Sequence, residues 1–361
     1  MRLFQNSGLY RAYVKRLNSI ATGAVTFDER RSKFLDDRFG APHFLKPVLE
    51  ADTQAFFTNG DDEMLQRMWA RENGLKGAVP LDQILLAQIE AHRTEVFYNV
   101  DPGRYSDDFV RSLPGSVRRK VAWLASPSPR INLGLYDMVL CNFPSLLDGY
   151  RRSNWNAAWF APAHDPEMDV YAQNAERPID VLFVGGYSRH HRRRAEVLDA
   201  VASRGEQANV VFHLDRSRLT RLAESPFGYL LPVGQHRRPA HIRRLSAAPV
   251  FGRQLYQALS QSKIVINGAI DMAGNDRGNM RCFESLGCGC ALVSDAGNYP
   301  EGMEDNLTLT CYSNALDAAV QVDRLLSDER ARRSIAVAGY RAVSQIYSKQ
   351  HQWDRFLELV Q

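Results

Sequence analysis

"GNMRCFESLGCGC" (residues 278–290) is the stretch that decides the fold of this chain. Asn279 suits the N-cap of a helix and Gly289 suits its end, while Phe283 and Leu286 are spaced to face inward. The stretch therefore predicts a short helix. The buried run "KIVIN" (263–267) precedes this helix and "CALVS" (290–294) follows it, which is a strand–helix–strand unit.

The same alternation of short β-rich runs and amphipathic stretches continues along the chain. This pattern is typical of parallel α/β layers, so we predict an α/β fold. The further predicted strands are residues 2–4, 54–58, 95–99, 120–124, 137–141, 180–186, 209–214 and 307–310.

The length of 361 residues exceeds one ordinary core and predicts two domains. The strand pattern restarts at residues 180–186, and the segment before it, 159–178, has three prolines and no periodicity. We expect a first domain over 1–161, a linker over 162–178, a second domain over 179–345 and a closing helix over 346–361.

The composition is that of a folded protein, with 45% hydrophobic and 24% charged residues. An odd number of cysteines, five, and the expected absence of a secretory leader favour free thiols in a reducing compartment. No run of about 18 apolar residues predicts a membrane span. We therefore expect a cytoplasmic protein.

The net charge of +4 hides local concentrations of positive charge. They are "RHHRRR" (189–194), "HRRPAHIRR" (236–244) and "RARR" (330–333). Such runs suit phosphate-bearing ligands, anionic lipid surfaces or nucleic acid, and they also occur as solvated faces.

The first of these runs follows a buried strand that ends in Gly185 and Gly186. Glycines after a strand let the backbone approach a phosphate, and the start of the next helix offers free N–H groups. Arginines such as Arg189 and Arg192 oppose the helix dipole there unless an anion is bound. The alternative is a plain glycine turn with arginines extended into water.

A second candidate site surrounds the opening stretch. Asn267 ends a strand, and Asn279 and Arg281 begin the helix, where a phosphate would meet backbone N–H groups. One turn later, the two oxygens of Glu284 suit a diol. The alternative is an Arg281–Glu284 ion pair on a surface helix, worth a few tenths of a kcal/mol.

These residues, in the order "Y-x-x-L-S-x-S-K-I-V-I-N … G-N-M-R-C-F-E-S-L-G-C-G-C-A-L-V-S-D", resemble the C-terminal domain of bacterial GT-B glycosyltransferases. The N-x-R-x-F-E-x-x-x-x-G core is most similar to the CgeB-like (spore-maturation-protein) branch. The resemblance covers residues 183–351 and includes "WFAPAHDPE".

The resemblance implies two Rossmann-like domains that face a cleft, with a C-terminal helix that crosses back to the first domain. It implies a nucleotide-sugar donor on the second domain and a glycan or lipid-linked acceptor on the first, in bacterial surface glycan or glycoconjugate synthesis. Glu284 would hold the donor ribose, while Asn279, Arg281 and the Gly185-Gly186 pair would lie near the diphosphate.

The implied reaction is sugar transfer with a nucleoside diphosphate as leaving group. Fixed N–H groups and Arg281 can stabilise that group electrostatically, so we expect no metal and no other cofactor. Arg277, with Asp276 beside it, stands shortly before Glu284 where common retaining enzymes carry a second glutamate, so retention or inversion stays open. An inverting enzyme needs a base, for which we consider His43 and Asp101.

Two other functions remain open. The same fold serves nucleotide-sugar epimerases, which need no acceptor. A protein that binds polyanions without turnover would need its arginine clusters on one face with interleaved aromatics, and here they lie in separate segments. We therefore expect no nucleic acid partner, but do consider peripheral association with the inner face of the cell membrane.

Overall fold

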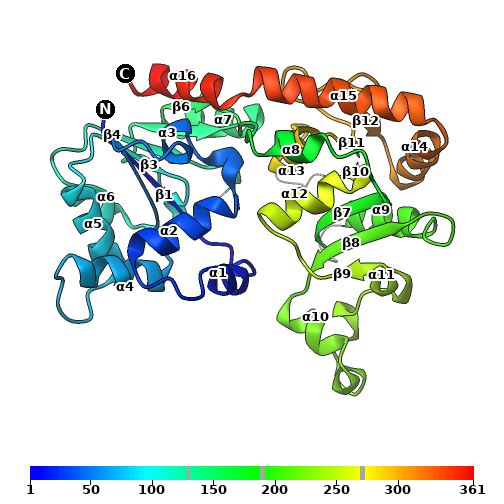
Figure 1. Cartoon of the computed structure of the whole chain (residues 1–361), viewed down its shortest axis with the longest axis horizontal. Helices are drawn as coiled ribbons and strands as arrows, with labels where there is room; N and C mark the ends of the chain where they lie inside the picture. The colour runs from blue at the N-terminus through cyan, green and yellow to red at the C-terminus, as the bar shows by residue number, and fades with distance from the viewer. Residues whose placement is uncertain (128–130, 188–191, 269–272) are drawn as a thin grey trace. The chain divides into compact units, whose positions relative to one another are not determined.

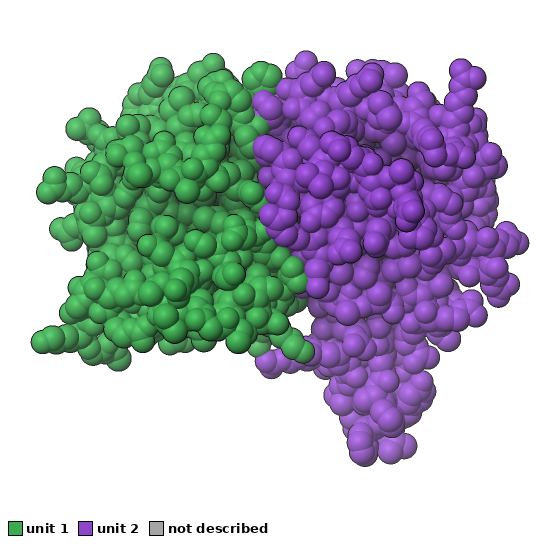
Figure 2. Space-filling model, viewed as in Figure 1, with its two compact units in different colours: residues 1–163, 349–361 green, residues 164–348 purple. Residues whose placement is uncertain are grey.

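The computed structural model describes residues 1–127, 131–187, 192–268 and 273–361. The chain divides into two compact units (Figure 2). Unit 1 comprises Met1–Ala163 and Lys349–Gln361, and unit 2 comprises His164–Ser348. Each unit contains one sheet of six parallel strands, which confirms the predicted α/β class with two Rossmann-like domains.

The sheet of unit 1 has the strand order β2-β1-β3-β4-β5-β6 (Figure 1). Its strands are β1 (Leu3–Ser7), β2 (Ala55–Asn59), β3 (Val96–Asn99), β4 (Arg119–Trp123), β5 (Met138–Cys141) and β6 (Ala157–Trp159). Its helices are α1 (Val14–Ile20), α2 (Phe27–Asp36), α3 (Lys46–Leu49), α4 (Glu63–Glu72), α5 (Leu81–Ala91), α6 (Asp107–Arg111), α7 (Pro144–Arg152) and α16 (Lys349–Val360), with 3-10 turns η1 (Ala41–His43) and η2 (Pro102–Arg104).

The last helix, α16, belongs to unit 1, as the predicted closing helix does. Phe356 is fully buried and packs against Tyr98 of β3 and against Phe160, with ring centroids 5.1 and 6.0 Å away. The apolar stripe of the C-terminal sequence therefore covers one face of the first sheet. Helices α5, α6 and α7 contribute to the core on the opposite face, around Phe4 and Phe97.

The sheet of unit 2 has the order β12-β11-β10-β7-β8-β9. Its strands are β7 (Ile179–Gly186), β8 (Val210–Asp215), β9 (Ser246–Ala247), β10 (Ser262–Ile266), β11 (Ala291–Asp295) and β12 (Thr310–Tyr312). Its helices are α8 (Met168–Ala172), α9 (Arg192–Ala202), α10 (Arg218–Ala223), α11 (Ala240–Arg244), α12 (Arg253–Ser260), α13 (Met280–Gly287), α14 (Ala315–Ser327) and α15 (Glu329–Ile346), with 3-10 turns η3 (Pro226–Tyr229) and η4 (Gly234–His236).

Helices cover both faces of this second sheet (Figure 1). Helices α9, α11 and α14 share one apolar core with alternate residues of the strands. Helices α8, α12 and α13 contact one another and contribute nothing to that core, which places them on the other face. Helix α8 lies inside segment 162–178, where His164 and Met168 are buried, so this part of the segment packs onto unit 2.

Among the described residues, no helix combines the length and the apolar character that crossing a lipid bilayer requires.

Candidate functional site

The carboxyl edge of the second sheet brings the predicted donor residues together. From β7 the chain adds β8 and β9 on one side, and then β10, β11 and β12 on the other, so the strand order reverses between β7 and β10. Ligands of open parallel sheets bind outside the carboxyl ends of strands at such a reversal. Arg189, one of the predicted residues, lies outside the described residues.

Glu284 is the most unusual group at this edge. Its side chain on α13 is only 2% exposed, and Arg281 Nη1 donates a hydrogen bond of 2.7 Å to its Oε2. Burial raises the pKa of the Glu284 carboxyl, and the Arg281 charge partly lowers it. The expected Arg281–Glu284 pair is thus present, but it is buried rather than on a surface helix. A buried carboxylate is costly and is a mark of functional sites.

Two polar groups beside Glu284 lack hydrogen-bond partners within the described part of the chain. The Nε–H of Arg281 and the Oγ of Ser285 are both buried and make no hydrogen bond there. Buried polar groups in folded proteins are nearly always paired. This face of α13 therefore has hydrogen-bonding capacity that a polar ligand can use.

The start of α13 is open as well. Asn279 is the N-cap, as predicted, but its side chain makes no capping hydrogen bond. The amide instead exchanges long hydrogen bonds, of 3.4 and 3.5 Å, with the side chain of Asn267. In the first turn, the backbone N–H of Cys282 donates to the backbone oxygen of Asn279 at 2.9 Å. The N–H groups of Met280 and Arg281 are not satisfied by the cap side chain and can meet an anion.

Asn267 directly follows β10, and its polar groups bond to three neighbouring segments of unit 2. Its side chain donates to Ser294 Oγ at 3.0 Å, and its backbone oxygen accepts from Tyr312 Oη at 2.7 Å. Together with its bonds to Asn279, these interactions join the ends of β10, β11 and β12 to the start of α13. Asn267 therefore holds the helix start in place.

Gly278, directly before the cap, has a φ of +98°, and a β-carbon there would lie 2.6 Å from Pro300 Cγ. We expect Gly278→Ala to lower the free energy of unfolding by about 1–3 kcal/mol, because strain and overpacking add. Urea unfolding of the two proteins checks this. Gly186→Ala is the control, since its β-carbon would meet no atom of the described residues within 4 Å and its φ is not positive. Equal losses in both variants would contradict the expectation.

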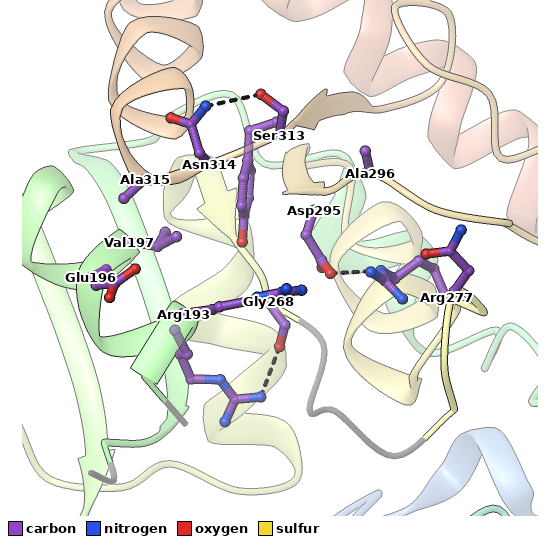
Figure 3. Close-up of a pocket in the computed structure, with 13 residues that line it drawn as sticks. Arg193, Glu196, Val197, Gly268, Arg277, Asp295, Ala296, Ser313, Asn314 and Ala315 are labelled. Atoms are coloured by element: carbon purple, nitrogen blue, oxygen red, sulfur yellow. Dashed lines mark hydrogen bonds and ion pairs between the residues drawn. The ribbon is translucent and has the colours of Figure 1, made fainter. Parts of the chain in front are cut away.

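A cavity of about 350 Å³ opens beside this helix start (Figure 3). It lies at the carboxyl ends of β10, β11 and β12, between the starts of α9 and α14. Its lining residues are Arg193, Arg194, Glu196, Val197, Gly268, Asn275, Arg277, Asp295, Ala296, Tyr312, Ser313, Asn314 and Ala315.

The charges around the cavity favour an anion. Its three arginines outnumber the two carboxylates, and one of these, Asp295, is paired with Arg277 Nε at 2.6 Å (Figure 3). Arg194 Nη2 donates to the backbone oxygen of Gly268 at 2.7 Å, which fixes its guanidinium at the cavity wall. Arg193 is exposed and reaches the same cavity from α9. A phosphate-bearing ligand fits this surface.

Gly185 and Gly186 are the last residues of β7, as in the predicted strand 180–186, and are paired with Leu214 and Asp215 of β8. Arg192 begins α9, is exposed and does not line the cavity. Arg193 and Arg194, which belong to the same basic run, do line it.

His43, a predicted base in unit 1, is a half-buried residue at the end of η1. Its ring packs against Trp123, with centroids 4.7 Å apart. Burial, together with the charge of Lys349, lowers the pKa of the imidazole to about 3. The ring is therefore neutral at physiological pH, which a base must be, but it is a weak proton acceptor.

This pKa has a consequence for stability. The unfolded chain protonates His43 near pH 6.5 and the folded chain does not until about pH 3, so stability is lost as the pH falls through this window. For a fully shielded ring the loss is about 1.4 kcal/mol per pH unit, and a half-buried ring gives less. We expect His43→Gln to remove this contribution, which urea unfolding of both proteins between pH 4 and 8 measures. Parallel pH curves would contradict it.

Asp101, the other predicted base, follows β3 at the carboxyl edge of the first sheet. Arg104 Nε donates to it at 2.8 Å, and Arg104 Nη2 pairs with Asp61 at 2.9 Å. Asp61 follows β2, and burial raises the pKa of its carboxyl. A β-carbon on Gly8, the residue after β1, would lie 2.4 Å from Asp101 Oδ2, so the Asp101 carboxylate lies close to the backbone at the end of β1.

The two carboxylates thus flank one arginine next to the reversal of strand order between β1 and β3. Asp61 was not predicted. The rule that pointed to Asp101, a polar residue just after a strand, also applies to Gly60-Asp61 after the predicted strand 54–58.

Metal ligands do not cluster in the part of the chain that the structure describes, where no group of three or more His, Cys, Asp or Glu side chains could hold an ion. The five cysteines are free thiols, and four of them are buried.

Comparison with known proteins agrees with this geometry. Residues 192–358 match the family model described as "Glycosyl transferase-like". No curated protein matches the chain.

Solved structures match about four fifths or more of the chain. HepE of Anabaena in complex with UDP and glucose is 13% identical, with 99% of both chains covered and a TM-score of 0.59. TarM of S. aureus, in complex with fondaparinux, α-GlcNAc-glycerol and UDP, is 12% identical, with 80% of this chain and 60% of TarM covered and a TM-score of 0.55. The pneumococcal O-GlcNAc transferase GtfA, with UDP and GlcNAc, is 10% identical over 79% of this chain and 60% of GtfA, with a TM-score of 0.51.

At these identities the structural matches establish the fold, which is that of GT-B glycosyltransferases. The family match lies on unit 2 and α16, where α13 and the cavity are found. Together they support a glycosyltransferase.

Proposed function

We propose that this protein is a metal-independent glycosyltransferase that moves a sugar from a nucleoside-diphosphate sugar to a hydroxyl acceptor. The observation that carries the proposal is the buried Glu284, paired with Arg281, on a helix whose N-cap side chain makes no capping hydrogen bond, at the edge where the strand order reverses. A nucleotide carries both a ribose diol, which Glu284 can hold, and a phosphate, which the start of α13 can hold.

In this proposal the protein acts mainly on the leaving group. Negative charge builds on the diphosphate as the bond to the sugar breaks. The N–H groups of the first turn of α13, Arg281 and the cavity arginines are already oriented, so they stabilise that charge without reorganising. The protein's own cations then stabilise the charge on the diphosphate, as a bound metal ion does in metal-dependent enzymes.

Unit 1 would provide the acceptor side. Asp61 and Asp101, joined through Arg104, lie at the carboxyl edge of its sheet, where hydroxyls of a glycan can be bound. Burial raises the pKa of the Asp61 carboxyl and lowers that of the His43 imidazole. Asp61 is therefore better suited than His43 to take a proton near neutral pH.

Three finer assignments belong to the same proposal. The N-x-R-x-F-E-x-x-x-x-G core supports the CgeB-like branch of the family. A glycan or lipid-linked acceptor fits a role in bacterial surface glycan synthesis. A lipid-linked acceptor would bring the protein to the inner face of the membrane from the cytoplasm.

Thermal unfolding against a panel of nucleoside diphosphates, with and without magnesium, tests the proposal. A ligand that binds only the folded state at about 100 times its Kd adds about 2.7 kcal/mol of stability. We expect one base to raise the Tm, equally with and without magnesium. A shift with heparin alone, lost in salt, would instead indicate a polyanion-binding protein. Turnover of the donor without any acceptor would indicate an epimerase.

The cavity makes its own prediction. We expect Arg193→Gln to weaken nucleoside diphosphate binding about tenfold, because a charge-assisted contact to phosphate is lost. Arg192→Gln is the matched control, since Arg192 is equally exposed but does not line the cavity. Titration calorimetry compares the two variants. Equal losses would show only a general effect of positive charge, and the reverse order would place the phosphate outside the cavity.

A further inference from the structure

One segment of unit 2 has no part in the proposed reaction. Residues 216–238, which include α10, η3 and η4 and are here called the projection, extend away from the rest of unit 2 (Figures 1 and 2). The sequence showed a basic run at its end but gave no reason for the apolar residues before it.

The projection exposes large apolar side chains. Leu230 is 85% and Phe227 74% exposed, and Tyr229 and Leu231 beside them are exposed as well. Leu219 and Leu222, three residues apart on α10, add two further exposed leucines. Six large apolar side chains are thus exposed within 13 residues of one segment, and such a concentration on a folded protein indicates an interaction site.

The backbone that presents these side chains is firmly tied. Arg237 donates to the backbone oxygens of Ala223 and Gly228 at 2.8 and 3.1 Å. Arg238 is buried and pairs with Glu224 through two hydrogen bonds of 2.6 and 2.8 Å. These hydrogen bonds fix the backbone of the projection, so its apolar side chains are exposed to solvent in a defined conformation.

The surroundings are strongly basic. Residues 216–244 contain seven arginines and one glutamate, so their net charge is 7 − 1 = +6 with neutral histidines. The glutamate, Glu224, is already paired with Arg238. Arg218 and Arg221 are exposed on α10, and Arg216 is exposed just before this helix. The guanidinium of Arg237 lies 3.6 Å from the ring centroid of Tyr229.

From this combination we infer that the projection binds the surface of an anionic lipid bilayer. Leu230, Leu231 and Phe227 can enter the boundary of the acyl chains, while tyrosine and arginine side chains remain at the level of the headgroups. Each arginine near an anionic surface strengthens binding about fivefold.

The same features count against other occupants. The projection itself has five arginines and one glutamate, a net charge of 5 − 1 = +4, so two projections repel each other, which opposes contact with a second copy. Single-stranded nucleic acid binds by stacking on aromatic rings, whereas four of the six exposed apolar side chains here are leucines, which do not stack.

Vesicle flotation of the full chain tests the inference. We expect the protein to float with vesicles of phosphatidylcholine and phosphatidylglycerol and to bind pure phosphatidylcholine far more weakly. Leu230→Glu should lower the partition coefficient at least tenfold. Leu307→Glu is the control, because Leu307 is another exposed leucine of unit 2 outside the projection, and it should bind as the unaltered protein does.

A second variant tests the charge. Arg218→Gln combined with Arg221→Gln should weaken binding to the anionic vesicles about thirtyfold and leave binding to neutral vesicles unchanged. All these variants should bind nucleotide normally, since none of the changed residues lies at α13 or the cavity. Failure of the lipid inference is therefore distinguishable from failure of the proposed function.

Three results would overturn the inference. One is an unaltered protein that does not float with anionic vesicles. Another is flotation that Leu230→Glu leaves intact. The third is a dimer in light scattering that dissociates in Leu230→Glu without any vesicle binding, which would assign the projection to a second copy.

Discussion

Replacing Glu284 by alanine is expected to weaken the binding of a nucleoside diphosphate by about 10- to 100-fold while the protein remains folded. A hydrogen bond to a charged group contributes about 1.5–3 kcal/mol, and the buried carboxylate has one oxygen, Oε2, on Arg281 and the other available for a ligand hydroxyl. Titration calorimetry gives the affinity, and circular dichroism confirms the fold.

The identity of the bound group can be tested with a second ligand. If Glu284 holds the ribose diol, a 2′-deoxynucleotide binds the unaltered protein more weakly than the ribonucleotide does, and Glu284→Ala binds the two equally. The two proteins and the two nucleotides form a double-mutant-type cycle, and a non-additive result isolates the contact between Glu284 and the diol. If the alanine variant still prefers the ribonucleotide by the same factor, Glu284 does not contact the diol.

The pH dependence of the ligand-free protein gives an independent check. The folded pKa of Glu284 is raised above its ordinary value of 4.5, so the group favours the folded state at low pH and this stability is lost as the pH rises through 4.5 toward the folded pKa. The Glu284→Gln variant cannot ionise. We therefore expect its stability relative to the unaltered protein to increase as the pH rises above 4.5, in urea unfolding without nucleotide.

How far the sequence predicts this site is clear from α13. The N-cap position of Asn279, the glycine end and the i+3 spacing of Arg281 and Glu284 follow from local rules and are present, although the Asn279 side chain makes no capping hydrogen bond. The burial of Glu284 does not follow from them, because α8 and α12, which pack beside α13, come from distant segments. Local spacing therefore could not distinguish a surface ion pair from a buried one.

Two strands of the structure, β6 and β9, were not predicted, because they are very short. The strands β6 (Ala157–Trp159) and β9 (Ser246–Ala247) have three and two residues, too few to show alternation, and both are edge strands. The cavity was not predicted because its walls come from separate segments near residues 193, 268, 277, 295 and 314. Only the parallel sheet brings these segments to one edge.

Replacing Lys349 by methionine is expected to destabilise unit 1 by about 3 kcal/mol. The Lys349 ammonium is buried and donates to the backbone oxygens of Ala41, Pro42 and Phe44 and to Gln352 Oε1. Methionine fills the same space but removes the side-chain donor of the Phe44 oxygen, and a buried unsatisfied acceptor costs about 1–3 kcal/mol. The loss of further charge-assisted bonds adds to this, while relief from burying a charge subtracts.

Lys46→Met is the matched control. Lys46, also in unit 1, forms a surface i,i+4 pair with Glu50 at 3.4 Å, so its loss should change stability by no more than about 0.5 kcal/mol. Urea unfolding compares the two variants. His43 supplies a readout that loss of packing alone would not change, because the Lys349 charge contributes to lowering the pKa of this imidazole. Its pKa, followed by NMR, should rise in Lys349→Met and not in Lys46→Met. A destabilised Lys349→Met protein with an unchanged His43 pKa would mean that the ammonium does not act on the loop that carries His43.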